Sequence, residues 1–136
     1  MNNEIEVLYF KIAEKAIEII PTEWNKIILN AEIEPGVVSS YFCFYTKKDN
    51  ELIEFNKISK IFNVDRQIYL QLFSELTDLI YKLNEECAKY TKPAWTIMTF
   101  ILSSDGAFNI DYSYDDLSTS STLSRRYAFK ETYLNN

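Results

Sequence analysis

Hydrophobic residues recur every three or four positions in two long stretches of the chain, which predicts two amphipathic helices. The first runs from Glu4 to Ile20, because Pro21 disfavours helical geometry at the residue before it. The second begins near Asp65, a residue type that caps helix N-termini, and runs to about Tyr90. The apolar stripe of this second helix consists of Ile68, Leu72, Leu76, Leu79, Leu83 and Cys87. We interpret both stripes as core-facing.

Between the two helices the hydrophobic pattern changes to a period of two, which indicates β-strands. One strand is predicted over 24–33 and another over 37–46. The Glu34-Pro35-Gly36-Val37 sequence between them fits a type II turn, because Pro presets φ at the second position and Gly permits positive φ at the third. A short edge strand is expected over 51–55, and 56–63 is interpreted as a connector.

A β-hairpin is predicted after the second helix, with arms at 94–103 and 107–115. Asp105-Gly106 lies between the arms, and Asp-Gly is a strong signal for a tight turn with positive φ. The second arm alternates: one face carries Phe108, Ile110, Tyr112 and Tyr114, and the other carries Asn109, Asp111, Ser113 and Asp115. We therefore expect one face of the hairpin to meet a core and the other to be polar and acidic.

The chain ends in a polar loop, STSSTLS, and a short helix over 125–134. The apolar contacts of that helix are expected to be Tyr127, Phe129, Tyr133 and Leu134. The predicted fold is α+β: a single antiparallel sheet of four to five strands, two long helices packed on one face, and a short C-terminal helix. Residues 1–136 are expected to form one domain.

Several classes of site are excluded by missing residue types. The chain has no His, which removes Ser-His-Asp and Cys-His catalysis and His-bearing zinc sites. Its two glycines are too few for a phosphate-cradling loop or a dinucleotide fingerprint. Cys43 and Cys87 are interpreted as buried free thiols, with a bridge between them as the alternative. No secretion signal or membrane-spanning run is visible, so a cytoplasmic protein without membrane association is expected.

Acidic residues dominate the charge, with a formal net charge of −6. This argues against direct nucleic-acid binding, which needs clustered Lys and Arg, and favours a basic partner. The imbalance is concentrated between Lys92 and Arg125, where no basic residue occurs. That window contains Asp105, Asp111, Asp115 and Asp116, which account for four of the six net charges.

Three interpretations of these carboxylates remain open. On an extended strand Asp111 and Asp115 share a face at roughly 13 Å, wider than the ~5–9.5 Å of paired acid–base catalysis. A divalent cation is a second reading, although the Asp-x-Asp-x-Asp-Gly loop pattern is missing. The third is a solvated acidic strand edge. Asp105 is explained by the turn alone, and Trp24 and Trp95 are either core anchors or surface contacts. No cofactor or metal is assigned.

Four segments resemble the YezG family of bacterial immunity proteins. They are IPTEWNKIILNAEI, the strand ending in YFCFYTK, the FNV before the long helix, and PAWTIMTFILSSDGAFNIDYSYDDL. The resemblance covers roughly 8–117. The Ile-Pro-x-Glu-Trp entry at 20–24, the strand entry at Trp95 and the run from Asp105 to Asp116 occur in the family's order.

The resemblance implies a cytoplasmic antitoxin, not an enzyme. Its partner is then a cognate toxin, often a basic nuclease exported by type VII secretion, and the free protein is expected to be a monomer or weak dimer. The candidate partner-binding residues are Asp105, Asp111, Tyr112, Tyr114, Asp115 and Asp116. The tyrosines alternate with the acids, so the alternative that they face the core stays open. A non-nuclease toxin and a ligand- or metal-binding protein are the competing functions.

Overall fold

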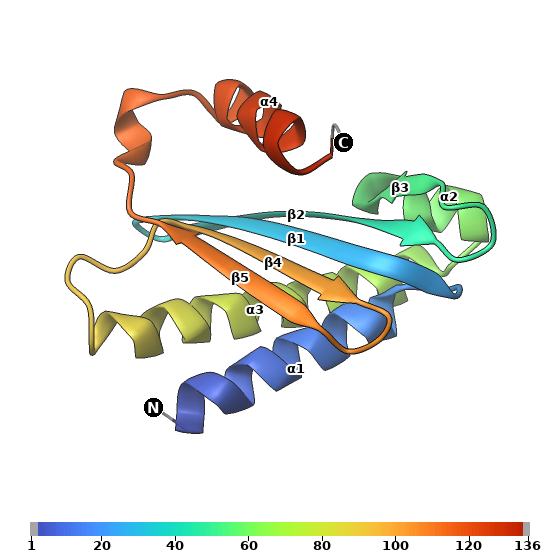
Figure 1. The fold of residues 1–136 in the computed structure, drawn as a ribbon, viewed down its shortest axis with the longest axis horizontal. Coiled ribbons are helices and arrows are strands. Elements are labelled where there is room, and N and C mark those ends of the chain that lie inside the picture. Colours follow the sequence, from blue (N-terminus) through green and yellow to red (C-terminus); the bar gives the residue numbers. More distant parts are fainter. Residues whose placement is uncertain (1–2, 135–136) are drawn as a thin grey trace.

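A computed structural model of the chain describes residues 3–134 as one sheet with helices on both of its faces (Figure 1). The elements in chain order are α1 (Asn3–Ile19), β1 (Trp24–Glu34), β2 (Val37–Thr46), β3 (Leu52–Glu54), the 3-10 turn η1 (Phe55–Lys57), α2 (Ile58–Phe62), α3 (Arg66–Ala88), β4 (Ile97–Ser103), β5 (Phe108–Ser113), η2 (Leu117–Thr119) and α4 (Thr122–Tyr133). The predicted α+β class and single antiparallel sheet are confirmed.

The sheet has five strands in the order β3-β2-β1-β4-β5, and every neighbouring pair is antiparallel. The long β1 strand therefore lies at the centre, between the two hairpins. Leu29 lies opposite Phe42 on one side and Phe100 on the other, which aligns the apolar residues of three strands on one face. The β4–β5 hairpin adds Ile110 to the same row.

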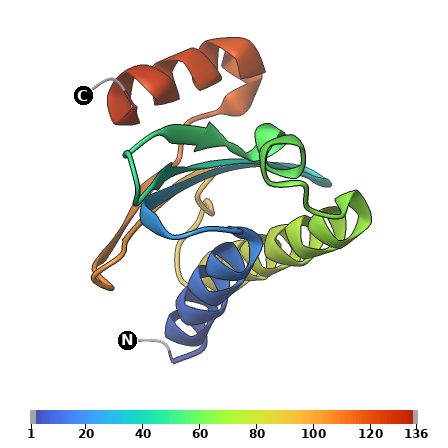
Figure 2. The ribbon, with the colours of Figure 1, turned by 90° about the vertical axis from the view of Figure 1, so that its right-hand side faces the viewer.

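Helices α1 and α3 lie side by side beneath this apolar face, and α4 lies across the opposite face (Figures 1 and 2). The main core joins the two long helices to the sheet through Leu8, Ile12, Ile27, Leu29, Phe44, Leu76, Ile80, Leu83 and Phe100. A second, smaller cluster beneath α4 contains Ile28, Tyr41, Cys43 and Phe129. Because β-strand side chains alternate, the same strands supply both cores. Cys43 and Cys87 are buried free thiols, as expected.

Each of the two long hairpins has a glycine with positive φ in its turn. Gly36 has a φ of 76°, which matches the third position of the predicted type II turn. In the second hairpin only Gly106, at 93°, takes positive φ. Gly106 N donates to Ser103 O at 2.9 Å and Ser103 N donates to Ala107 O at 2.8 Å, so the loop has three residues. In hairpin loops of three residues, the last loop residue commonly adopts positive φ, which brings the chain back into register with the first strand.

Several predicted details differ from the structure. Ile68 belongs to the predicted buried stripe of the second helix, but its side chain is 58% exposed. Tyr69 is buried instead, and its hydroxyl donates a hydrogen bond to Phe55 O at 2.8 Å. At this end of α3, the buried face therefore lies one residue further along the chain than predicted. The connector at 56–63 contains η1 and α2. The last helix begins at Thr122, capped by Ser121 within the supposed loop, and Tyr127 on it is 68% exposed.

We expect Asp65→Ala to lower the free energy of unfolding by about 1 kcal/mol. Asp65 Oδ1 accepts hydrogen bonds from Gln67 N at 2.9 Å and Ile68 N at 3.1 Å, two donors with no partner inside α3. Urea denaturation measures the change. Asp65→Ser is the matched control, since it keeps a capping oxygen and should retain most of the stability; equal losses in both variants would contradict the capping role.

Candidate functional site

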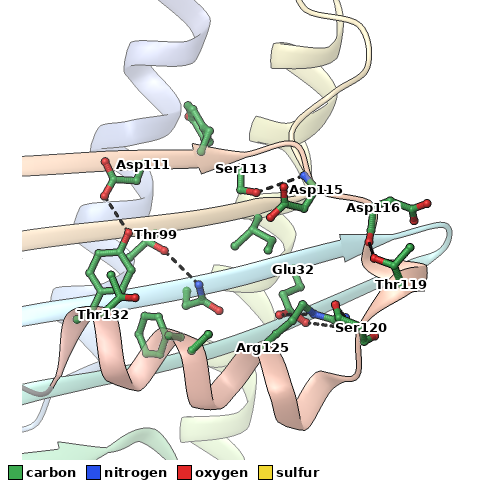
Figure 3. A pocket seen from close by; sticks show the side chains of 16 residues that line it. Glu32, Thr99, Asp111, Ser113, Asp115, Asp116, Thr119, Ser120, Arg125 and Thr132 are labelled. Carbon is green, nitrogen blue, oxygen red and sulfur yellow. Dashed lines mark hydrogen bonds and ion pairs between the residues drawn. The ribbon is translucent and has the colours of Figure 1, made fainter.

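A cleft of about 570 Å³ lies between α4, η2 and the face of the sheet that α1 and α3 leave uncovered (Figure 3). Its polar lining comes from every element around it: Asn30, Glu32, Thr99, Asp111, Ser113, Asp115, Asp116, Thr119, Ser120, Arg125, Thr132 and Tyr133. Three of the predicted acids, Asp111, Asp115 and Asp116, therefore meet at one concave surface.

The floor of the cleft is a row of polar side chains set by strand register. Asn30 on β1 lies opposite Thr99 on β4, and Thr99 lies opposite Asp111 on β5. Asn30 and Thr99 are 5% and 3% exposed, and Asn30 Nδ2 donates to Thr99 Oγ1 at 3.1 Å. The row thus runs from a buried amide at the sheet centre to an exposed carboxylate at the sheet edge.

An ion pair between Glu32 and Arg125 closes one end of the cleft. Arg125 Nε and Nη2 donate to the two carboxylate oxygens of Glu32 at 2.8 and 3.1 Å. Arg125 Nη1 also donates to Leu117 O at 3.0 Å and Ser120 O at 2.8 Å. The Glu32 carboxylate raises the pKa of the Arg125 guanidinium. One side chain therefore ties α4 to η2 and to β1 at this end of the cleft.

Hydrogen bonds orient the carboxylates of Asp111 and Asp116 and fix the backbone at Asp115. Tyr133 Oη on α4 donates to Asp111 Oδ2 at 2.9 Å, and burial together with this bond raises the pKa of Tyr133. Asp116 Oδ1 accepts from the Ser118 hydroxyl at 2.7 Å and from Ser118 N at 2.9 Å, which lowers the pKa of Asp116. Thr96 Oγ1 donates to the backbone oxygen of Asp115 at 2.7 Å, which ties the backbone at Asp115 to the residue that precedes β4.

These three carboxylates are not neutralised by neighbouring cations. Across residues 3–134, the Lys and Arg ion pairs involve other acids, including the Arg125–Glu32 pair at the end of the cleft. Asp111, Asp115 and Asp116 are all exposed. The rim of the cleft is therefore negative, and it favours the approach of a positively charged group.

Of the other predicted site residues, Asp105 and Tyr114 lie outside the cleft, whereas Tyr112 is among the residues that line it. Asp105 accepts from Ala107 N at 2.9 Å in the hairpin turn. The six residues of β5, at ~3.3 Å each, separate it from Asp115 by roughly 20 Å. The Tyr112 ring stacks on Trp95 with 5.1 Å between centroids and its hydroxyl is 2.8 Å from Tyr9 Oη, so it faces the helices. Tyr112 therefore does not present its ring beside the acids, whereas Tyr114 is 49% exposed.

The described residues offer little for covalent or metal chemistry. Within 3–134, no group of three or more Cys, Asp or Glu side chains is close enough to hold a metal ion. Burial raises the pKa of the Cys43 thiol to about 12, so this thiol stays protonated and is a poor nucleophile. None of the helices in this range is long and apolar enough to cross a bilayer. The arrangement is suited to binding a basic group through charge and shape.

Comparison with known proteins identifies the family. The family model for YezG-like immunity proteins matches residues 5–136, nearly the whole chain. The chain belongs to the YezG-like immunity protein family. Immunity protein YezG of Bacillus subtilis (strain 168) is 37% identical over 110 residues, which cover 81% of this chain and 73% of that protein. Immunity protein YezG of Bacillus spizizenii is 38% identical over 110 residues, covering 81% and 68%.

A more distant relative carries a different name. Type VII secretion system protein EsaG of Staphylococcus aureus is 25% identical over 113 residues, which cover 83% of this chain and 69% of that protein. The resemblance found in the sequence is thereby confirmed, and the chain, as a member of a YezG-like immunity family, is not an enzyme. Immunity proteins neutralise toxins, so its partner is a cognate toxin.

Sequence reasoning missed the residues that shape the cleft in this YezG-like protein. The predicted site does not include Glu32, Asn30 or Arg125, although the first two are buried polar residues on β1. Their signal was available: Asn30 and Glu32 share a strand face with the apolar Ile28. A mixed face of this kind indicates cover by a polar-lined element, which here is α4.

Proposed function

We propose that this protein neutralises its cognate toxin by stoichiometric binding, and that the toxin is a nuclease whose basic surface docks against the acidic cleft. The observation that carries the proposal is that Asp111, Asp115 and Asp116 meet at the rim of a concave surface, where no Lys or Arg among residues 3–134 forms an ion pair with them. A nuclease binds a polyanion, so its working surface is basic. The net charge of −6 on this protein adds attraction at longer range.

The family also supports a proposal for how the toxin is exported and where in the cell the two proteins meet. One relative is named as a type VII secretion system protein, which supports a toxin exported by that route. An immunity protein has to meet newly made toxin before export, so we place the protein in the cytoplasm, where residues 1–136 act as a single immunity domain. Electrostatic steering would accelerate capture of the toxin, and contacts within the cleft would set how long the complex lasts.

The test is to neutralise the three acids while keeping their hydrogen-bond acceptors. The variant Asp111→Asn, Asp115→Asn, Asp116→Asn changes the net charge from −6 to −3. We expect its affinity for a nuclease domain that the unmodified protein neutralises to fall by about tenfold to hundredfold, because three charge contacts are lost. Calorimetric titration measures the affinity, and survival of cells expressing the toxin measures protection.

A matched control separates the cleft from overall charge. The variant Glu14→Gln, Glu51→Gln, Asp78→Asn changes the net charge by the same amount at exposed positions on α1, the β2–β3 turn and α3. We expect affinity in this control to fall by less than about threefold, in line with screened long-range attraction. Unchanged affinity and protection in the cleft variant would overturn the acidic-cleft mechanism, and equal losses in both variants would do the same.

A further inference from the structure

Strand β5 forms an open edge of the sheet. Within residues 3–134 it pairs only with β4, and the strand order β3-β2-β1-β4-β5 leaves its outer side without a neighbouring strand (Figures 1 and 2). An edge strand presents a row of unpaired backbone donors and acceptors, which is a template for adding another strand.

The hydrogen bonds to β4 show which backbone groups point outward. Ala107 O accepts from Ser103 N and Ser113 O accepts from Thr96 N, both at 2.8 Å, so these two residues face β4. In an antiparallel pair the facing residues alternate along the strand. The N–H and C=O groups of Phe108, Ile110 and Tyr112 therefore point away from β4 at the outer edge.

This edge lacks the usual protection against pairing. Exposed edges are commonly blocked by Pro, by Lys or by a bulge. The sequence of β5, FNIDYS, contains neither Pro nor Lys, and its register with β4 is continuous from Phe108 to Ser113. The cleft-side face of the edge is polar, with Asp111 exposed, while Phe108 on the helix side is 48% exposed.

Charge indicates what kind of strand fits. A second copy of this chain pairing edge to edge in the antiparallel sense would bring two Asp111 carboxylates onto the same face, and each copy carries a net charge of −6. Like charges across a strand pair are destabilising, whereas opposite charges stabilise it. A strand with basic residues on the cleft side and apolar residues on the helix side complements both faces of β5.

We propose that the toxin contributes such a strand: an extended segment with alternating basic and apolar residues that adds antiparallel to β5 as the sixth strand of the sheet. This inference rests on the proposed function and specifies how the toxin engages the edge of the acidic cleft. The apolar residues of the segment lie opposite Phe108, Ile110 and Tyr112 and make the backbone hydrogen bonds. Its basic residues lie opposite Asn109, Asp111 and Ser113, directly beside the cleft rim.

The test uses the wild-type protein and a seven-residue peptide of alternating Lys and Val, KVKVKVK. We expect this peptide to bind with added solvent protection of the amides of Phe108, Ile110 and Tyr112, measured by NMR hydrogen exchange. A peptide N-methylated at its three valines keeps every charge but loses the ladder donors, and should bind about tenfold more weakly or worse. Failure of KVKVKVK to bind, equal binding of the N-methylated peptide, or protection elsewhere would each overturn strand addition.

A pair of variants tests the same edge from the protein side. Ile110→Pro removes an N–H that points away from β4, and Ile110→Ala makes a similar loss of side-chain packing while keeping that N–H. We expect the Pro variant to bind KVKVKVK about tenfold more weakly than the Ala variant. If the two bind equally while the triple Asn variant still loses toxin protection, strand addition is wrong and the immunity mechanism stands. If the edge binds as expected but no nuclease is neutralised, the proposed function fails instead.

Discussion

Replacing Glu32 with Ala is expected to lower the free energy of unfolding by about 3–5 kcal/mol, because it leaves the Arg125 guanidinium buried without its counter-ion. The two side chains are only 6% and 10% exposed, and they form two hydrogen bonds in a parallel arrangement. A bidentate contact between ionised groups is stronger than a single neutral hydrogen bond. Urea denaturation at neutral pH, followed by far-ultraviolet circular dichroism, measures the loss.

Two controls identify the cause of that loss. Glu34 lies 4.0 Å from Arg125 Nη2 and its side chain is 48% exposed, so Glu34→Ala should cost less than about 1 kcal/mol. The double variant Glu32→Leu, Arg125→Leu removes both charges, and we expect it to recover much of the stability that Glu32→Ala loses. A loss below about 1 kcal/mol for Glu32→Ala would show that the pair contributes little to holding α4 against the sheet.

The same pair links stability to the site. Arg125 binds β1 through Glu32 and the η2 region through Leu117 and Ser120, so it determines where α4 lies over the sheet. If α4 moves, Tyr133 no longer donates to Asp111 and the lining that α4 contributes to the cleft is displaced. We therefore expect Glu32→Ala to weaken toxin binding as well, even at temperatures where the protein remains folded.

The sequence predicted the elements whose signals are local. The step of three and four in α1, the Pro35-Gly36 turn and the alternation in β5 each depend on neighbours within a few residues, and the structure confirms them. The Asp65 cap is another local signal, and it fixes the start of α3 to within a residue. These features are set by backbone geometry and by the period of burial.

The cleft depends on relations that a local pattern does not contain. Asp105 and Asp111 belong to one acidic window in the sequence, yet the hairpin places Asp105 at the far end of β5 from the cleft. Arg125 follows Glu32 by 93 positions and contacts it only because the chain crosses to the second face of the sheet between β5 and η2. The predicted fold packs the two long helices on one face and does not place the short C-terminal helix, so it offers no cover for Asn30 and Glu32.

Trp95→Ala is expected to lower the free energy of unfolding by about 3–5 kcal/mol, because the indole fills the core between β5 and α3. Trp95 is 1% exposed, its ring stacks on Tyr112, and its backbone oxygen accepts a hydrogen bond from Asn84 Nδ2 at 2.8 Å. This burial makes Trp95 a core anchor, one of the two roles that the sequence left open. Chemical denaturation measures the loss.

The matched variant Trp95→Phe separates the volume of the indole from its polar group. Trp95 Nε1 is buried and has no hydrogen-bond partner among residues 3–134. A buried donor without a partner costs about 1–3 kcal/mol, so removing it offsets part of the packing lost with the smaller ring. We therefore expect Trp95→Phe to cost less than about 1.5 kcal/mol. A cost equal to that of Trp95→Ala would mean that a buried water accepts a hydrogen bond from the indole N–H. Trp95 would then stabilise the core through this hydrogen bond as well as through apolar packing.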